Sequence, residues 1–199
     1  MISHQHKFIF VHIPKCGGTS IENFFGIDSG KFCKQTLCGF YKNYGWLQHC
    51  TLAEMETDFN IDINKFYCFT FVRNPWDRMV SSYFYDLNRI KDKKLTFFNY
   101  VKNRPEINKY HKQCHERAQY NYIINQSNQP SMNYIGKLEN LQQDFNIVCD
   151  KIGIPQQQLP HANKTDHKHY TEYYDDETRE IVAEKYAKDI EYFGYKFGE

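Results

Sequence analysis

Residues 8–22 read FIFVHIPKCGGTSIE, and this stretch predicts a strand, a tight loop and a helix in succession. Residues 8–13 form a nearly continuous apolar run, which is typical of a parallel strand buried on both faces. Pro14 ends that run, and two adjacent glycines follow it. Thr19 and Glu22 then stand at the spacing of a capping box, with threonine as the N-cap, so we expect a helix to begin there.

A second unit of the same kind lies further along the chain. Residues 66–72 are apolar throughout and end at Arg73, after which Asn74 can cap a helix that holds Pro75 in its first turn. Apolar residues then recur at helical spacing. The segment therefore predicts a second buried strand that leads directly into a helix.

The remaining elements complete an α/β pattern. A third strand is expected around residues 132–135, ended by Gly136, with helices over residues 138–152 and 175–192. Strands that alternate with helices imply a parallel sheet. We therefore predict an α/β fold, a central parallel sheet flanked by helices, in a single domain over residues 1–199.

The composition is that of an ordinary soluble chain without a strong overall charge. Of its 199 residues 41% are hydrophobic and 25% charged, and the formal net charge is +1, so no global field attracts nucleic acid or an anionic membrane. The apolar runs are strand-sized, so no transmembrane segment is expected. The segment before Phe8 is too short for a signal peptide; we expect a cytoplasmic protein, or one of the Golgi lumen if an N-terminal anchor has been removed.

The cysteines do not form a recognisable framework. Seven cysteines, an odd number without the spacing of a disulfide scaffold, favour free thiols in a reducing compartment. Cys33, Cys38, His49 and Cys50 have the side chains of metal ligands. Adjacent ligands at 49 and 50 chelate poorly, however, and no paired CxxC motif occurs, so no metal is expected.

The loop at residues 14–20 has the features of an anion site. It joins the end of a strand to the start of a helix, where free backbone N–H groups and the helix dipole favour negative charge. Gly17 and Gly18 let the backbone approach an anion closely, while Ser20 adds a hydroxyl donor and Lys15 a positive charge. A Walker A loop has its lysine after the glycines, whereas Lys15 precedes them. The loop therefore argues against an ordinary ATPase or kinase.

The stretch FIFVHIPKCGGTSI resembles the 5'-phosphosulfate loop of sulfotransferases that use 3'-phosphoadenosine 5'-phosphosulfate (PAPS), particularly the membrane-type glycan O-sulfotransferases and their bacterial relatives. The resemblance implies a P-loop-like nucleotide site, PAPS as the donor cosubstrate, adenosine 3',5'-bisphosphate as its product, and no metal. The residues that it assigns to the donor are Lys15, Cys16, Gly17, Gly18, Thr19 and Ser20.

A second stretch, FTFVRNPWDRMVSSYFY at residues 69–85, resembles the 3'-phosphate motif of the same family. If Asn74 is the N-cap, Ser81 lies two turns further along nearly the same face of the helix. Arg73 and Ser81 can then converge on one phosphate, to which arginine offers two parallel N–H groups. The alternative is that Arg73 forms a structural ion pair and Ser81 is a small packing residue.

His49 is the predicted catalytic base. Transfer to an alcohol needs a group that takes the hydroxyl proton, and histidine suits that role near neutral pH. His49 lies in QHCTLAE, residues 48–54, in an exposed loop just before a second capping box formed by Thr51 and Glu54. This stretch resembles the segment that carries the base in glycan O-sulfotransferases. A structural or acceptor-contacting histidine is the alternative, whereas His12, inside the first strand, is expected to be buried with a hydrogen-bond partner.

The C-terminal third also resembles the family, whereas the role of residues 91–129 is not assigned. Asn163, Lys164 and Thr165 place an amide, a charge and a hydroxyl on a turn-prone segment. This segment either folds over the donor or acceptor, or is a plain surface loop.

These features predict a sulfotransferase that moves a sulfuryl group by in-line displacement from PAPS to an acceptor hydroxyl. His49 takes the acceptor proton, and Lys15 stabilises the charge that develops on the bridging oxygen. The resemblance points to a carbohydrate acceptor, with a lipid head group or small natural product left open; the partners are this acceptor and the small-molecule donor, not nucleic acid. The alternatives are a kinase-like phosphotransferase on a P-loop scaffold, which would need magnesium, and a non-catalytic nucleotide-binding module.

Overall fold

The computed structural model describes residues 1–42, 44–90, 94–105, 109–160 and 167–199. The chain divides into two compact units. The first comprises Met1–Val72 and Gln119–Ala162, and the second Arg73–Ala118 and Asn163–Glu199. Within the described ranges, every helix is too short or too polar to span a bilayer.

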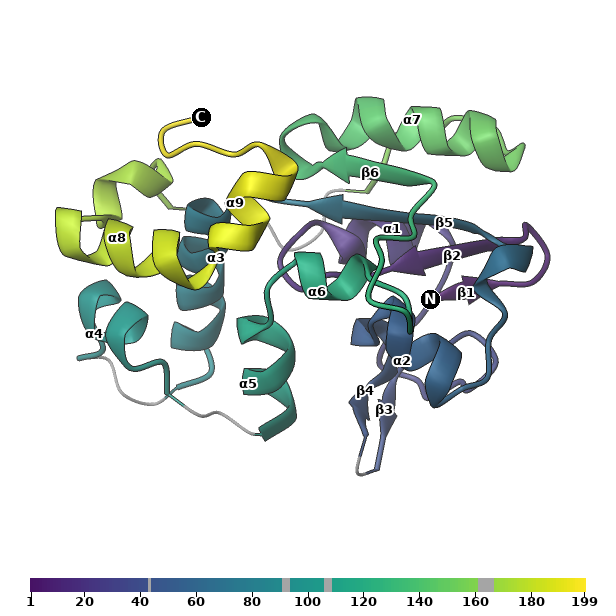
Figure 1. The fold of residues 1–199 in the computed structure, drawn as a ribbon, viewed down its shortest axis with the longest axis horizontal. Coiled ribbons are helices and arrows are strands. Elements are labelled where there is room, and N and C mark those ends of the chain that lie inside the picture. The colour runs from purple at the N-terminus through teal and green to yellow at the C-terminus, as the bar shows by residue number, and fades with distance from the viewer. Residues whose placement is uncertain (43, 91–93, 106–108, 161–166) are drawn as a thin grey trace. The chain divides into compact units, whose positions relative to one another are not determined.

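A four-stranded sheet forms the centre of the first unit, in the order β1–β2–β5–β6 (Figure 1). Its strands are β1 (Ile2–Ser3), β2 (Phe8–Val11), β5 (Tyr67–Val72) and β6 (Tyr134–Lys137). Strands β2, β5 and β6 run parallel, as predicted, but β1 pairs antiparallel with β2. The sheet is therefore mixed rather than purely parallel, because the short turn after β1 can only return the chain in the opposite direction.

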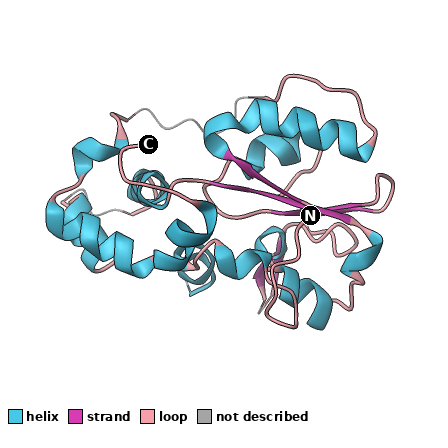
Figure 2. Ribbon diagram, turned by 45° about the horizontal axis from the view of Figure 1, so that its top comes forward, coloured by secondary structure: helices cyan, strands magenta, loops and turns pink. Residues whose placement is uncertain are grey.

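Helices lie on both faces of this sheet (Figure 2). The helices of the first unit are α1 (Gly18–Phe24), α2 (Leu52–Thr57), α6 (Tyr120–Ile123) and α7 (Leu141–Ile152), with the 3-10 helices η1 (Leu47–His49), η2 (Ile63–Lys65) and η3 (Leu138–Asn140). A short hairpin, β3 (Phe40–Tyr41) with β4 (Gly45–Trp46), precedes η1. This arrangement is the α/β architecture expected from the alternating pattern of strands and helices.

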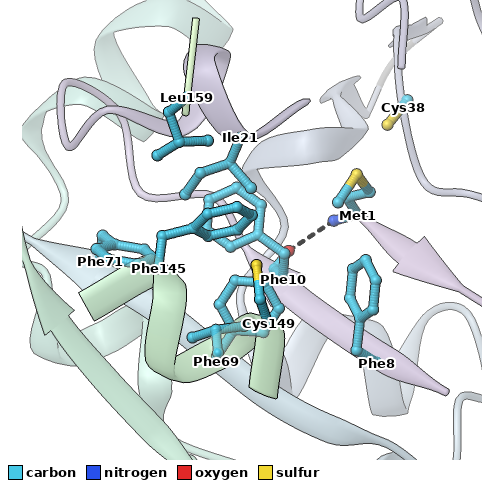
Figure 3. Close-up of a cluster of buried hydrophobic side chains, with 11 residues drawn as sticks. Met1, Phe8, Phe10, Ile21, Cys38, Phe69, Phe71, Phe145, Cys149 and Leu159 are labelled. Atoms are coloured by element: carbon cyan, nitrogen blue, oxygen red, sulfur yellow. Dashed lines mark hydrogen bonds between the residues drawn. The ribbon is translucent and has the colours of Figure 1, made fainter. Parts of the chain in front are cut away.

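The core of the first unit lies between the sheet and helices α1 and α7 (Figure 3). Alternate residues of β2 and β5 face this layer, since neighbouring residues of a strand point to opposite faces. The side chains involved are Phe8, Phe10, Phe69 and Phe71 from the strands, Ile21 from α1, and Phe145, Val148 and Cys149 from α7. Each such side chain stabilises the fold by about 1.5–3 kcal/mol when fully buried. The packing holds the end of β2 and the start of α1 in place.

Gly136 does not end the third strand as predicted. It lies inside β6, opposite Phe71 of β5. A Cβ at this position would stand 2.4 Å from Cε1 of Phe71. The strand needs glycine here to accommodate a neighbouring ring, and the strand continues to Lys137. The predicted helix beyond it is confirmed from Leu141 to Ile152.

The second unit consists of helices in its described part. They are α3 (Pro75–Leu87), α4 (Phe97–Lys102), α5 (Lys109–Glu116), η4 (Tyr170–Tyr173), α8 (Asp176–Lys185) and α9 (Ala187–Phe193). Helix α3 begins as predicted, with the Asn74 side chain accepting a hydrogen bond from the N–H of Trp76. The single helix predicted over residues 175–192 is wrong: Tyr186, at φ −117° and ψ 26°, leaves helical geometry and separates α8 from α9.

Candidate functional site

The loop between β2 and α1 contains two residues in the left-handed backbone region. Lys15 has a φ of 69° and Gly17 a φ of 79°. This conformation costs a residue other than glycine about 1–2 kcal/mol, so the surrounding structure must hold Lys15 in place. Left-handed residues that alternate with ordinary ones can turn successive backbone N–H groups toward a common side, which suits an anion.

The predicted capping box at Thr19 and Glu22 is wrong. Helix α1 begins at Gly18, with Gly17 as its N-cap. The carboxylate of Glu22 is buried and accepts a hydrogen bond from Nδ1 of His12 at 2.7 Å. Glu22 is therefore used in a tertiary contact rather than in a local cap. The expectation that His12 is buried with a partner is confirmed.

Gly18 is required by the packing of His12. A Cβ at residue 18 would stand 2.1 Å from Cδ2 and 2.2 Å from Nε2 of the His12 ring. At Gly17 a Cβ would meet Cδ1 of Leu138 at 2.8 Å. Both glycines thus allow close approaches by side chains of the same unit. These contacts do not test the predicted role of Gly17 and Gly18 in binding an anion, which stays a prediction.

The other loop residues are anchored on one side and partly exposed on the other. Cys16 is 1% exposed, and its Sγ donates to Oε1 of Gln119 at 3.2 Å. Ser20 is buried, while Lys15 and Thr19 are partly exposed. The sequence gives no local signal for this contact of Gln119, because its partner Cys16 lies 103 positions earlier in the chain.

His49 lies beside His12 in the same unit. It is the last residue of η1, partly buried rather than in an exposed loop as expected. Its Nδ1–H donates to the backbone oxygen of His12 at 3.0 Å. The two rings meet edge to face, with centroids 4.6 Å apart and an interplanar angle of 67°. Since Nδ1 carries the proton, Nε2 is the ring nitrogen that can accept one.

The surroundings of His49 favour its neutral form. Burial lowers the pKa of His49 most, and the charge of the neighbouring His12 lowers it further, to about 3. The hydrogen bond to the His12 carbonyl raises the pKa but does not offset these two effects. The pKa of Glu22 is also lowered: burial alone would raise it, but the charge and hydrogen bond of His12, together with the N-terminus and His49, outweigh that effect. After His49, the predicted capping box of Thr51 and Glu54 is confirmed at the start of α2.

Arg73 and Ser81 belong to the second unit. Nε of Arg73 donates to Oδ2 of Asp77 at 2.7 Å, so the ion pair considered as an alternative is present. Ser81 is buried in α3. The next arginine along the helix, Arg78, donates to backbone oxygens, among them that of Arg117 at 3.1 Å. The role of Arg73 and Ser81 toward a phosphate stays a prediction.

Three further expectations concern the loop at residues 163–165, the thiols and a metal site. Asn163, Lys164 and Thr165 lie outside the described residues. In the part of the chain that the structure describes, no cysteine pair forms a disulfide, and no group of three or more His, Cys, Asp or Glu side chains is arranged to hold a metal ion.

The comparisons with known proteins identify the class to which the chain belongs. A model of the sulfotransferase family matches residues 1–196, so the chain belongs to that family. It is also 32% identical over 89 residues to an uncharacterized protein of Archaeoglobus fulgidus, over 45% of this chain and 69% of that protein. No solved structure matches. Membership supports sulfuryl transfer in general, between a small-molecule donor and an acceptor.

Proposed function

We propose that this chain transfers a sulfuryl group from PAPS to a hydroxyl of a carbohydrate, with residues 1–199 acting as one sulfotransferase domain. The hydrogen bond from Nδ1 of His49 to the His12 carbonyl carries the proposal. It ties the candidate base to the residue that leads from β2 into the Lys15 loop, and it leaves Nε2 as the proton-accepting nitrogen.

The residues of the loop fit a negatively charged donor group. Lys15 and Gly17 in the left-handed region suit backbone N–H groups directed at an anion, and the Lys15 ammonium adds a charge. In the proposal, Lys15, Cys16, Gly17, Gly18, Thr19 and Ser20 hold the 5'-phosphosulfate. Arg73 and Ser81 hold the 3'-phosphate, an assignment that rests on the sequence motif, as does a donor or acceptor role for residues 163–165.

The reaction is a displacement at sulfur. The acceptor oxygen forms a bond to sulfur while the bond from sulfur to the phosphate oxygen breaks. Nε2 of His49 takes the proton of the hydroxyl, which becomes more acidic as its oxygen bonds to sulfur. Lys15 neutralises the charge left on the departing oxygen. The lowered pKa keeps His49 neutral at physiological pH but also makes Nε2 a weak base, so in this proposal the proton moves only once bonding to sulfur has made the hydroxyl acidic.

The nature of the acceptor rests on resemblance alone. The segments around Lys15 and His49 resemble those of glycan O-sulfotransferases, which favours a carbohydrate over a lipid head group or a small natural product. A cytoplasmic or Golgi-lumen location is part of the same proposal.

Sulfuryl transfer is tested with radiolabelled PAPS and a panel of carbohydrate acceptors. His49→Asn keeps an amide that can donate to the His12 carbonyl but lacks the nitrogen that accepts the proton. We expect this variant to lose turnover by about 100-fold or more while it still binds adenosine 3',5'-bisphosphate. His169→Asn, which replaces an exposed histidine, is the matched control. Turnover at the wild-type rate in His49→Asn would exclude His49 as the catalytic base.

Thermal stabilisation by nucleotides separates this function from its alternatives. Adenosine 3',5'-bisphosphate should raise the melting temperature of the wild type, since a ligand that binds only the folded form stabilises it. The shift should be lost in Arg73→Ala and kept in Arg89→Ala, which removes an exposed arginine of the same unit. Equal shifts with the bisphosphate and with ADP would contradict the 3'-phosphate assignment and favour a phosphotransferase.

A further inference from the structure

Cys33 and Cys38 face each other across a turn of the first unit. The N–H of Cys33 donates to the oxygen of Cys38 at 2.9 Å, and the N–H of Cys38 donates back to the oxygen of Cys33 at 3.0 Å. Residues that exchange both bonds in this way have Cα atoms about 5.5 Å apart, with side chains on the same side of the ladder. Disulfides span Cα distances of about 4.4–6.8 Å, so the backbone already has the required separation.

The two thiols have complementary environments. Cys33 is partly exposed, and hydrogen bonds with Thr36 lower the pKa of its thiol. Cys38 is 1% exposed at the edge of the core, and burial raises the pKa of its thiol. A reagent from solution therefore reacts first with Cys33, and the Cys38 thiol lies on the paired residue, where it can react second. This is the arrangement of an attacking cysteine and a resolving cysteine.

We propose that Cys33 and Cys38 form a reversible disulfide, made by exchange with a small-molecule disulfide of the glutathione type. The Cys33 thiolate attacks one sulfur of the oxidant, which forms a mixed disulfide and releases one thiolate. Cys38 then loses its proton and attacks the sulfur of Cys33, which forms the internal disulfide and releases the second thiolate. The protein loses two protons and two electrons, and one molecule of the disulfide oxidant takes them up to become two thiols.

The disulfide would act on the segment that carries His49. The residue after Cys38 is Gly39, whose N–H donates to Oε1 of Gln48 at 3.0 Å and whose oxygen accepts from the N–H of Leu47 at 3.0 Å. A cross-link between residues 33 and 38 restrains this turn, and through these two bonds it restrains η1. Oxidation is therefore expected to slow the opening of the Leu47 hydrogen bond.

The experiment incubates the folded protein with oxidised glutathione, blocks remaining thiols, and maps the cross-link after tryptic digestion. Cleavage after Lys31, Lys34 and Lys42 releases FCK and QTLCGFYK, so the disulfide appears as these two peptides joined. We expect the joined pair, the loss of two of the seven thiols, and recovery of both with dithiothreitol. Cys33→Ser should abolish the pair, and Cys114→Ser, at a partly exposed cysteine of the second unit, should leave it intact.

The result that overturns the site is a stable glutathione adduct at Cys33 while Cys38 keeps its thiol. Hydrogen exchange of the Leu47 amide tests the coupling: slower exchange in the oxidised protein supports it, and equal rates in both states refute it. Neither readout uses turnover or PAPS, so the test of the Cys33–Cys38 disulfide is independent of the proposed sulfuryl transfer.

Discussion

Acidification tests the environment of His49 directly. Its pKa is about 3 in the folded protein against 6.5 for an unperturbed histidine, so below about pH 6.5 the unfolded chain binds a proton that the folded chain does not. The stability contributed by the neutral imidazole is therefore present above pH 6.5 and is lost as the pH falls toward 3. At pH 5 the loss from this one group is about 2 kcal/mol. Because pH 5 lies well above the folded pKa, this magnitude depends mainly on the pKa in the unfolded state.

The assay is urea unfolding at about pH 7.5 and pH 5, followed with two spectroscopic probes because the chain has two compact units. His49→Asn removes the titrating ring, so its stability should fall by about 2 kcal/mol less than that of the wild type between the two pH values. The control His169→Asn should follow the wild type. Equal losses in wild type and His49→Asn, or an NMR titration of His49 with a midpoint near 6.5, would refute the reasoning.

Two further changes test the packing of each unit. Gly18→Ala pushes a methyl group into the ring of His12, so we expect a loss of about 1–3 kcal/mol in the free energy of unfolding, measured by urea titration. In the control Gly30→Ala, at an exposed glycine, the free energy of unfolding should stay within about 0.5 kcal/mol of the wild type. Similar losses in both variants would contradict a clash between the added methyl group and the His12 ring. In the second unit the hydroxyl of buried Tyr100 donates to the Asp86 carboxylate at 2.6 Å, so Tyr100→Phe should cost about 1.5–3 kcal/mol, and an unchanged melting temperature would contradict this bond's contribution.

Features set by a few neighbouring residues were predicted well from the sequence. The capping box at Thr51 and Glu54 and the Asn74 cap both depend on contacts within four positions. The parallel pairing of β2 with β5 followed from two apolar runs of strand length. Such patterns can be recognised because the groups that satisfy each other are close together in the chain.

The same local reasoning failed where a distant partner competed for a side chain. Thr19 and Glu22 have the spacing of a capping box, yet His12 takes the carboxylate of Glu22 and the helix begins one residue before Thr19. Gly136 looked like the end of a strand, but it is there because the ring of Phe71 leaves no room for a Cβ. In both cases burial gives the tertiary contact more weight than the local signal.

The sequence alone determined the order of strand, loop and helix around Lys15, since hydrophobic periodicity and turn residues act over short distances. It also singled out Lys15 and His49 as chemically suited residues. Only the tertiary structure decided that His49 donates Nδ1–H to the His12 carbonyl, that Glu22 holds the His12 ring, and that burial lowers the pKa of His49. These contacts join residues 10 and 37 positions apart, and desolvation arises only once the whole core has formed around them.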